Sequence, residues 1–215
     1  MPDQTGTPFT CHCCAASLCF ESAVSYCRIC PACQHLNYQQ NQNGPLRIKK
    51  LAPVQEEMSA IRLSTRGAYG DIGFEVIGRL QYMFQERYRN HWYIKYANGS
   101  GGWLGDWDGS YSLFNPVEAL RSTFERPSPG KPVQVSNVEY LTGQIDTSRE
   151  VSGEGEVGCF HVNEDKFITL ELYTLAGQLA LANIFTDKKV EAFTGQYLNL
   201  ADLNLQELRQ HHDWV

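Results

Sequence analysis

Seven of the chain's eight cysteines lie within residues 11–33, and their spacing suits a metal ion. Cys11 and Cys14 form one Cys-x-x-Cys pair, and Cys30 and Cys33 form a second pair fifteen residues later. Two such pairs at this separation are the usual ligand supply of a structural zinc site, which needs four tetrahedral ligands. The sequence therefore predicts one structural zinc ion, and a ribbon this short depends on that ion for most of its folding free energy.

Three further cysteines of the cluster, Cys13, Cys19 and Cys27, leave alternatives open. Cys27 and Cys30 also form a Cys-x-x-Cys, so Cys27 could replace Cys33 as a ligand. We favour Cys33 because a proline sets a tight turn between Cys30 and Cys33. The spare residues Cys19 and Cys27 are interpreted as small buried side chains with inert thiols. A redox role is the other possibility, although no thioredoxin-like strand–helix context accompanies these cysteines.

The composition is that of a globular protein, with 42% hydrophobic and 20% charged residues. The opening "MPDQTGTPFT" has neither a basic start nor an apolar stretch, so it does not resemble a secretory signal. No segment approaches the eighteen or so apolar residues that a transmembrane helix needs. We therefore expect a cytoplasmic protein, in which clustered cysteines favour metal or redox chemistry over disulfides.

Charge is distributed unevenly along the chain. The net charge is −6 overall, with +3 in residues 46–131 and −8 in residues 132–215. Nonspecific binding to nucleic acid requires a positive face that displaces counterions, and the overall acidity argues against it. The acidic side chains around "SGEGE" are interpreted as a solvated loop.

The pattern of residues 67–114 is typical of an antiparallel meander. Apolar and polar residues alternate from Phe74 to Gln85, which predicts a long strand with one apolar face. The segments "HWYIKYA", "GWL" and "YSLF" predict three more strands, joined by tight turns such as "NGSG". Gly78 in the middle of the first strand predicts a bulge where the sheet curves.

Alternation resumes after the proline-rich "RPSPGKP" and continues to about residue 200. We therefore predict an all-β fold with little helix, in which two antiparallel β units pack together as a small barrel-like or sandwich-like module. The predicted divisions are a zinc ribbon at residues 8–40, a linker at residues 41–62, a first β unit at residues 63–126 and a second β unit at residues 127–215.

Basic and aromatic residues interleave within the meander and suggest an interaction surface. Aromatic and arginine side chains are enriched at the energetic centres of protein interfaces. The same combination on a curved sheet can stack the bases of single-stranded nucleic acid. Protein binding is favoured because the chain is acidic overall. The predicted surface residues are Arg79, Arg87, Arg89, Trp92, Trp103 and Trp107.

A catalytic centre has little support in the sequence. Cys159 and His161 are two residues apart, so on a strand they share one face and could act as a nucleophile and its base. No third group that would orient the histidine can be named. The sequence contains no phosphate-binding glycine loop, nucleophile elbow or zincin helix. We therefore predict a protein that is not an enzyme, with a cysteine-dependent enzyme as the weakest alternative.

The two Cys-x-x-Cys pairs are followed by "YGDIGFEVIGRLQY" and then by "WYIKYANGSGGWLGDWDGSYSL". This order resembles the bacterial domain-of-unknown-function family numbered 4178, whose members often carry such strands behind a zinc ribbon. The chain departs from that family at Ala15 and Gln34, where glycine usually follows each pair. It also departs at Val157, Gly158 and Cys159, where the family tends to continue a Gly-Glu-Leu-Pro-Trp run. The resemblance implies a non-catalytic bacterial β protein linked to a membrane-stress system, and it transfers no activity.

These observations lead to one expected function and its alternatives. We expect a non-enzymatic adaptor that contains one structural zinc ion and binds a partner protein. The alternative is a nucleic-acid-binding protein built from a zinc ribbon and a small barrel. Four thiolate ligands leave no open coordination position, so the zinc is expected to be structural and not catalytic.

Overall fold

A computed structural model describes residues 6–38, 49–56, 59–85, 87–158, 165–187 and 189–210. This part of the chain is almost entirely β structure, as predicted, and its only helices are two short 3-10 turns. The strands are β1 (Pro8–Thr10), β2 (Ser17–Cys19), β3 (Cys27–Ile29), β4 (Leu36–Tyr38), β5 (Arg66–Tyr69), β6 (Ile72–Phe84), β7 (Arg87–Tyr96), β8 (Gly101–Trp107), β9 (Ser110–Val117), β10 (Pro132–Val135), β11 (Val138–Val157), β12 (Ile168–Tyr173), β13 (Gln178–Ile184) and β14 (Val190–Leu198). The 3-10 helices are η1 (Arg121–Phe124) and η2 (Leu200–Leu203).

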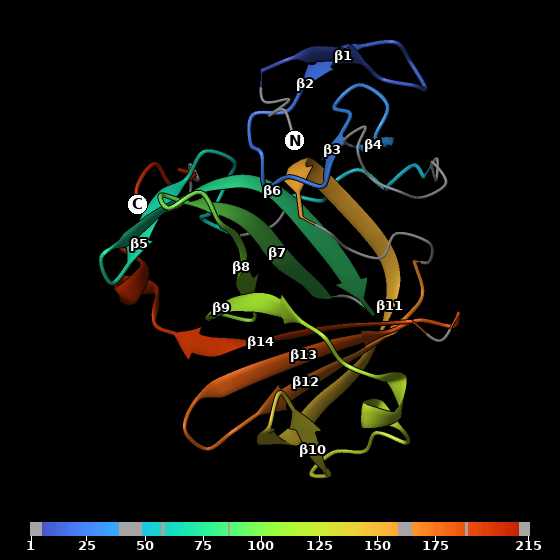
Figure 1. The fold of residues 1–215 in the computed structure, drawn as a ribbon, viewed down its shortest axis with the longest axis vertical. Helices are drawn as coiled ribbons and strands as arrows, with labels where there is room; N and C mark the ends of the chain where they lie inside the picture. The colour runs from blue at the N-terminus through green and yellow to red at the C-terminus, as the bar shows by residue number, and fades with distance from the viewer. Residues whose placement is uncertain are drawn as a thin grey trace.

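Eight strands form a closed antiparallel barrel, in the order β6, β7, β8, β9, β14, β13, β12 and β11, with β11 pairing back onto β6 (Figure 1). The predicted meander corresponds to β6 to β9 and is confirmed. The two predicted β units are not separate layers. They are joined at two seams, β9 with β14 and β6 with β11, so both belong to one continuous sheet.

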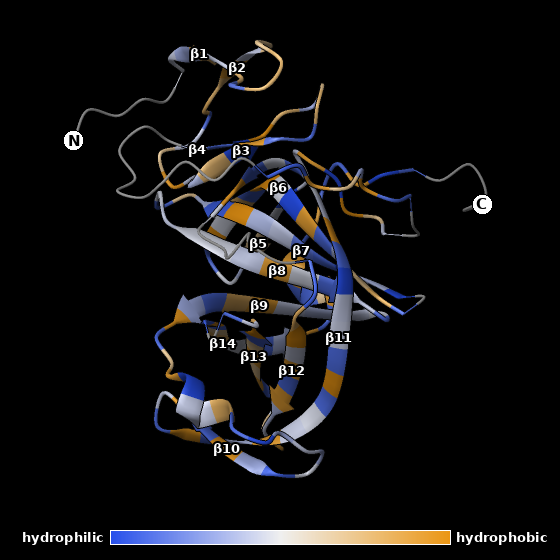
Figure 2. Ribbon diagram, turned by 90° about the vertical axis from the view of Figure 1, so that its right-hand side faces the viewer, coloured by the Kyte–Doolittle hydropathy of each residue, from blue (hydrophilic) through white to orange (hydrophobic). Residues whose placement is uncertain are grey.

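The 20-residue strand β11 closes the barrel. Its first half pairs with β12 and its second half pairs with β6. Register shifts between Thr142 and Gln144 and between Ser148 and Glu150 let the strand bend around the barrel. The end of β11 then pairs with β3 of the N-terminal ribbon (Figure 2). One strand therefore connects the barrel wall to the ribbon.

The barrel interior is a packed core that extends into the ribbon. Cys27 and Ile29 of β3 and Leu36 of β4 belong to the same hydrophobic cluster as the inward-facing barrel side chains. Both ribbon views place β3 and β4 across one end of the barrel. The buried barrel members of this cluster are Leu80, Tyr82, Phe84, Tyr93, Trp103, Trp107, Phe114, Val151, Val157, Phe167, Leu179, Leu181, Phe185 and Phe193.

The outer face of the barrel is also covered. Ile61 and Leu203 pack on the outside of β6 to β9, and Phe124 packs with β10 on the outside of β12 and β13. Strands buried on both faces lose the simple alternation of a half-exposed sheet.

Residues 49–56 and 59–62 of the predicted linker belong to the folded structure. Leu51 and Ile61 are buried, and the Ala52 amide donates a hydrogen bond of 3.1 Å to the Val151 carbonyl. The rest of the predicted linker, residues 41–48 and 57–58, lies outside the described residues.

The predicted bulge at Gly78 is confirmed by a register shift between Val76 and Gly78. Strand β11 passes so close at this point that a Cβ atom on Gly78 would lie 1.7 Å from the Glu156 carbonyl oxygen. Glycine is therefore required by close backbone approach.

Replacing this glycine should open the seam between β6 and β11. We expect Gly78→Ala to lower the free energy of unfolding by about 3 kcal/mol or more, because the clash is with backbone and cannot relax by a side-chain rotation. Gly73→Ala on the same strand is the control, since its Cβ would meet nothing closer than 3.8 Å. Urea denaturation of both variants tests this, and equal losses would contradict it.

His91 lies inside the barrel among aromatic rings, 4.8 Å from the Tyr82 ring and 5.0 Å from the Phe114 ring between centroids. Burial and the nearby Arg89 charge lower the pKa of His91 to about 3. The unfolded chain, with a histidine pKa of about 6.5, therefore binds one more proton between these two values. His91 therefore makes its full contribution to the free energy of unfolding above pH 6.5, and that contribution is lost as the pH falls.

We expect the free energy of unfolding to fall by about 1.4 kcal/mol per pH unit between pH 6.5 and 3 because of His91. The His91→Phe variant should lack this decrease. Because the cysteines also bind protons in acid, the informative quantity is the difference between wild type and variant, measured by urea denaturation at several pH values. Parallel stability curves for the two proteins would show that His91 is not buried in its neutral form.

Candidate metal centre

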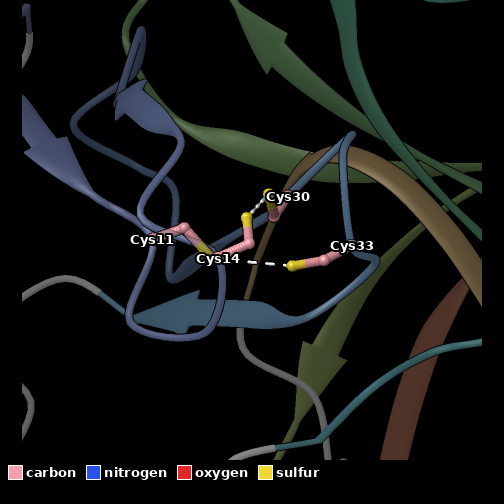
Figure 3. A group of neighbouring side chains, drawn as sticks. All are labelled: Cys11, Cys14, Cys30 and Cys33. Carbon is pink, nitrogen blue, oxygen red and sulfur yellow. Dashed lines mark hydrogen bonds between the residues drawn. The ribbon is translucent and has the colours of Figure 1, made fainter.

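The structure brings the four predicted ligands Cys11, Cys14, Cys30 and Cys33 together, with all four sulfur atoms within 4.8 Å of one another (Figure 3). The Sγ atoms of Cys11 and Cys33 are 3.7 Å apart, as are those of Cys14 and Cys30. A tetrahedral ion with metal–sulfur distances of about 2.3 Å requires sulfur–sulfur distances of roughly 3.8 Å. None of the seven described cysteines is in a disulfide. The four thiols can therefore bind one metal ion.

The same backbone turn positions each pair of cysteines. The Cys11 carbonyl accepts a hydrogen bond of 2.9 Å from the Ala15 amide, and the Cys30 carbonyl accepts one of 2.8 Å from the Gln34 amide. Ala15 and Gln34 adopt left-handed backbone angles, with φ of 59° and 63°. These are the two positions where a glycine would adopt the turn without strain.

Backbone amides around the cage favour thiolates. Burial raises the pKa of the Cys11 thiol, but the amides of Cys14 and Cys13 and the Asn37 side chain together outweigh it and lower this pKa to about 6. Burial raises the pKa of the Cys30 thiol above its usual value. Four thiolates at these distances repel one another, and a bound cation relieves that repulsion, so metal binding is coupled to proton release.

The remaining cysteines have different surroundings. Cys27 is fully buried in the core shared with the barrel, so Cys33 and not Cys27 completes the set of four. Cys19 is partly buried in β2, whereas Cys13 is exposed. The proposed pair of Cys159 and His161 lies outside the described residues.

Glu156 of β11 fixes the ribbon against the barrel, which the sequence did not indicate. Its buried carboxylate accepts hydrogen bonds from the amides of Glu21 (2.6 Å) and Ser22 (3.2 Å). It also accepts one from the Ser25 hydroxyl (2.5 Å) and pairs with Arg28 at 2.7 Å. The interpretation of this acidic segment as a solvated loop is therefore wrong. The only sequence feature that indicated a strand here was the spacing of Glu154 and Glu156, which lie two residues apart as side chains on one face of a strand do.

The predicted interaction surface is also mostly buried. Arg79 is 1% exposed, donates hydrogen bonds to the Asn90 side chain and stacks 4.5 Å over the Trp92 ring. Arg89 points into the barrel and pairs with Asp146 at 3.0 Å. The side chain of Arg87 is 48% exposed. The residues Arg79, Arg89, Trp92, Trp103 and Trp107 therefore form no contact surface.

The burial of these residues has a simple physical cause. Barrel closure encloses the inner face of β7 and β8, and Ile61 and Leu203 pack on the outer face. The arginines are compensated by amide and carboxylate partners. The nucleic-acid alternative thereby loses the exposed basic and aromatic platform on which it depended.

The chain matches no family model, and comparison with curated proteins and with solved structures gives no match. The resemblance to the bacterial family noted from the sequence therefore stays a prediction. Within the described residues, no helix has the length and apolar character needed to cross a membrane.

The left-handed residues of the two turns allow a test of the cage geometry. We expect Ala15→Gly and Gln34→Gly each to raise the stability of the metal-bound protein by about 1 kcal/mol, because glycine adopts positive φ without the Cβ penalty. Ala32→Gly is the control, since this exposed residue lacks a positive φ and the substitution should destabilise. Thermal denaturation at fixed metal concentration measures all three. A loss of stability in the first two variants would contradict the turn geometry.

Proposed function

We propose that the chain is a non-enzymatic adaptor, in which one structural zinc ion holds an N-terminal ribbon at the end of a closed barrel. The observation that carries the proposal is the set of four sulfur atoms within 4.8 Å of one another, of which two pairs are 3.7 Å apart. Zinc suits four thiolates in this geometry, and an iron centre is the competing occupant. Because all four positions are filled by protein, the ion has a structural and not a catalytic role.

The ribbon is held rigidly, which supports its use as a recognition surface. Its loop is bound by the Glu156 carboxylate, and the Tyr93 hydroxyl donates a hydrogen bond of 2.8 Å to the Val24 carbonyl. A surface ordered before binding loses less conformational entropy when a partner docks.

The tips of the two cysteine turns face solvent. His12 and Ala15 of the first turn and Pro31 and Ala32 of the second are exposed. We assign the partner-binding surface to these tips. The packed barrel then acts as the support that presents them, and the family resemblance favours a bacterial cytoplasmic setting.

The first experiment is metal analysis of the purified, reduced full-length chain after loosely bound ions have been removed. We expect about one zinc ion per chain, lost in the Cys30→Ser/Cys33→Ser variant and retained in Cys19→Ser. Iron in place of zinc would refute the metal assignment, and wild-type protein without metal would refute the structural site itself.

A second experiment tests the adaptor role by affinity purification from the native host. A charged variant of the tips, His12→Glu/Ala32→Glu, leaves all four ligands in place. Leu175→Glu is the matched control, because Leu175 is 94% exposed and lies in the turn between β12 and β13. We expect one dominant partner protein that wild type and the Leu175 variant retain and the tip variant loses. A partner retained by the tip variant, or recovery of nuclease-sensitive nucleic acid instead, would contradict the proposal.

A further inference from the structure

A second group of metal-binding side chains lies beside the four-cysteine cage. Cys13, Cys33 and His35 place one sulfur or nitrogen atom each within 4.8 Å of one another. Cys33 belongs to both groups. Cys13 is exposed, while Cys33 and His35 are partly buried, so this group opens toward solvent. A Cys, Cys, His combination is a common donor set for zinc and related thiophilic ions.

The orientation of His35 suits a metal ligand. Its Nδ1 atom lies 3.1 Å from the Cys33 carbonyl oxygen. A carbonyl only accepts hydrogen bonds, so Nδ1 is the donor in this contact and Nε2 is the ring nitrogen left for a metal ion. Histidine ligands of metals usually donate their other ring N–H to such an acceptor, which fixes the tautomer. The Cys33 carbonyl therefore holds the His35 ring through one nitrogen and leaves the other nitrogen available as a ligand atom.

The charge of the occupied cage favours a second cation. A divalent ion with four thiolates carries a net charge of −2, and a thiolate sulfur bound to one ion keeps lone pairs that can bind another. The Coulomb attraction between this anionic site and a second cation a few ångströms away is substantial. Cys33 is the cage ligand placed to be shared, because its sulfur lies within 4.8 Å both of the other cage sulfurs and of the donor atoms of Cys13 and His35.

We propose that Cys13, Cys33 and His35 form a second, exchangeable site for a zinc-class ion, bridged to the structural ion through the Cys33 thiolate. The inference rests on the proposed metal function of the cage. Three protein ligands leave one coordination position for water or for a donor atom of a partner, unlike the closed cage. The site therefore exchanges its ion with solution while the structural ion stays bound.

Zinc titration of the full-length reduced chain, followed by native mass spectrometry and calorimetry, tests this proposal. We expect two steps in wild type, a tight first ion and a weaker second ion. Cys13→Ser and His35→Gln should keep the first step and weaken the second at least about tenfold. Cys19→Ser, which removes a thiol outside both groups, should keep both steps.

Each outcome separates the second site from the cage. A single bound ion in wild type would overturn the second site and leave the structural site intact, whereas no bound ion would overturn both. A second ion that persists unchanged in Cys13→Ser and His35→Gln would identify binding elsewhere on the surface and overturn the assignment. Retention of the first ion in both variants confirms that each is folded.

Discussion

The buried carboxylate of Glu156 is the interaction on which the arrangement of ribbon and barrel depends. A carboxylate removed from water is costly unless donors surround it. Here two backbone amides, a hydroxyl and a guanidinium, all from residues 21–28, provide that compensation. Glu156 lies at the end of β11, immediately after the residues of β11 that pair with β6. The strand that closes the barrel therefore also determines where the ribbon docks.

The ribbon and the barrel also share part of one hydrophobic core. The ribbon has only a small hydrophobic cluster of its own, formed by Cys11, Leu18 and Cys30. Three more of its buried apolar residues, Cys27, Ile29 and Leu36, lie in the hydrophobic cluster of the barrel. Cys30 of the cage lies one residue beyond Ile29, the last residue of β3. The position of Cys30 is therefore coupled through β3 to the packing at the end of the barrel. Docking of the ribbon on the barrel in turn holds the cysteine ligands close together.

Sequence patterns predicted the features that depend on neighbouring residues. The cysteine spacing indicated the four ligands, period-two alternation indicated β6, and Gly78 indicated a bulge. The pairings of β9 with β14 and of β6 with β11 join residues far apart in the chain, and no local pattern encodes such partners. For the same reason the sequence predicted exposure for Arg79 and Trp92. Trp92 is buried beneath Ile61, which lies in the segment predicted to be a linker, and beneath the distant Leu203.

Electrostatic partners explain why arginines can occupy both faces of the barrel wall. Arg79 on the outer face is satisfied by Asn90 and Glu154, and Arg89 on the inner face by Asp146 and Glu171. A buried guanidinium with matched acceptors and an aromatic ring beneath it is compatible with a stable core. Basic and aromatic residues that alternate in a strand therefore indicate a surface only when one face of that strand meets solvent.

The left-handed backbone angles of the non-glycine residues Ala15 and Gln34 are consistent with a metal-held turn. A left-handed non-glycine residue costs about 1–2 kcal/mol. Binding of a structural zinc ion by four ligands supplies on the order of 10 kcal/mol. A bound zinc ion would therefore outweigh the strain of both turns, so the residue at the strained position can vary. By this comparison the cysteines determine the geometry of the cage, and Ala15 and Gln34 affect only its stability.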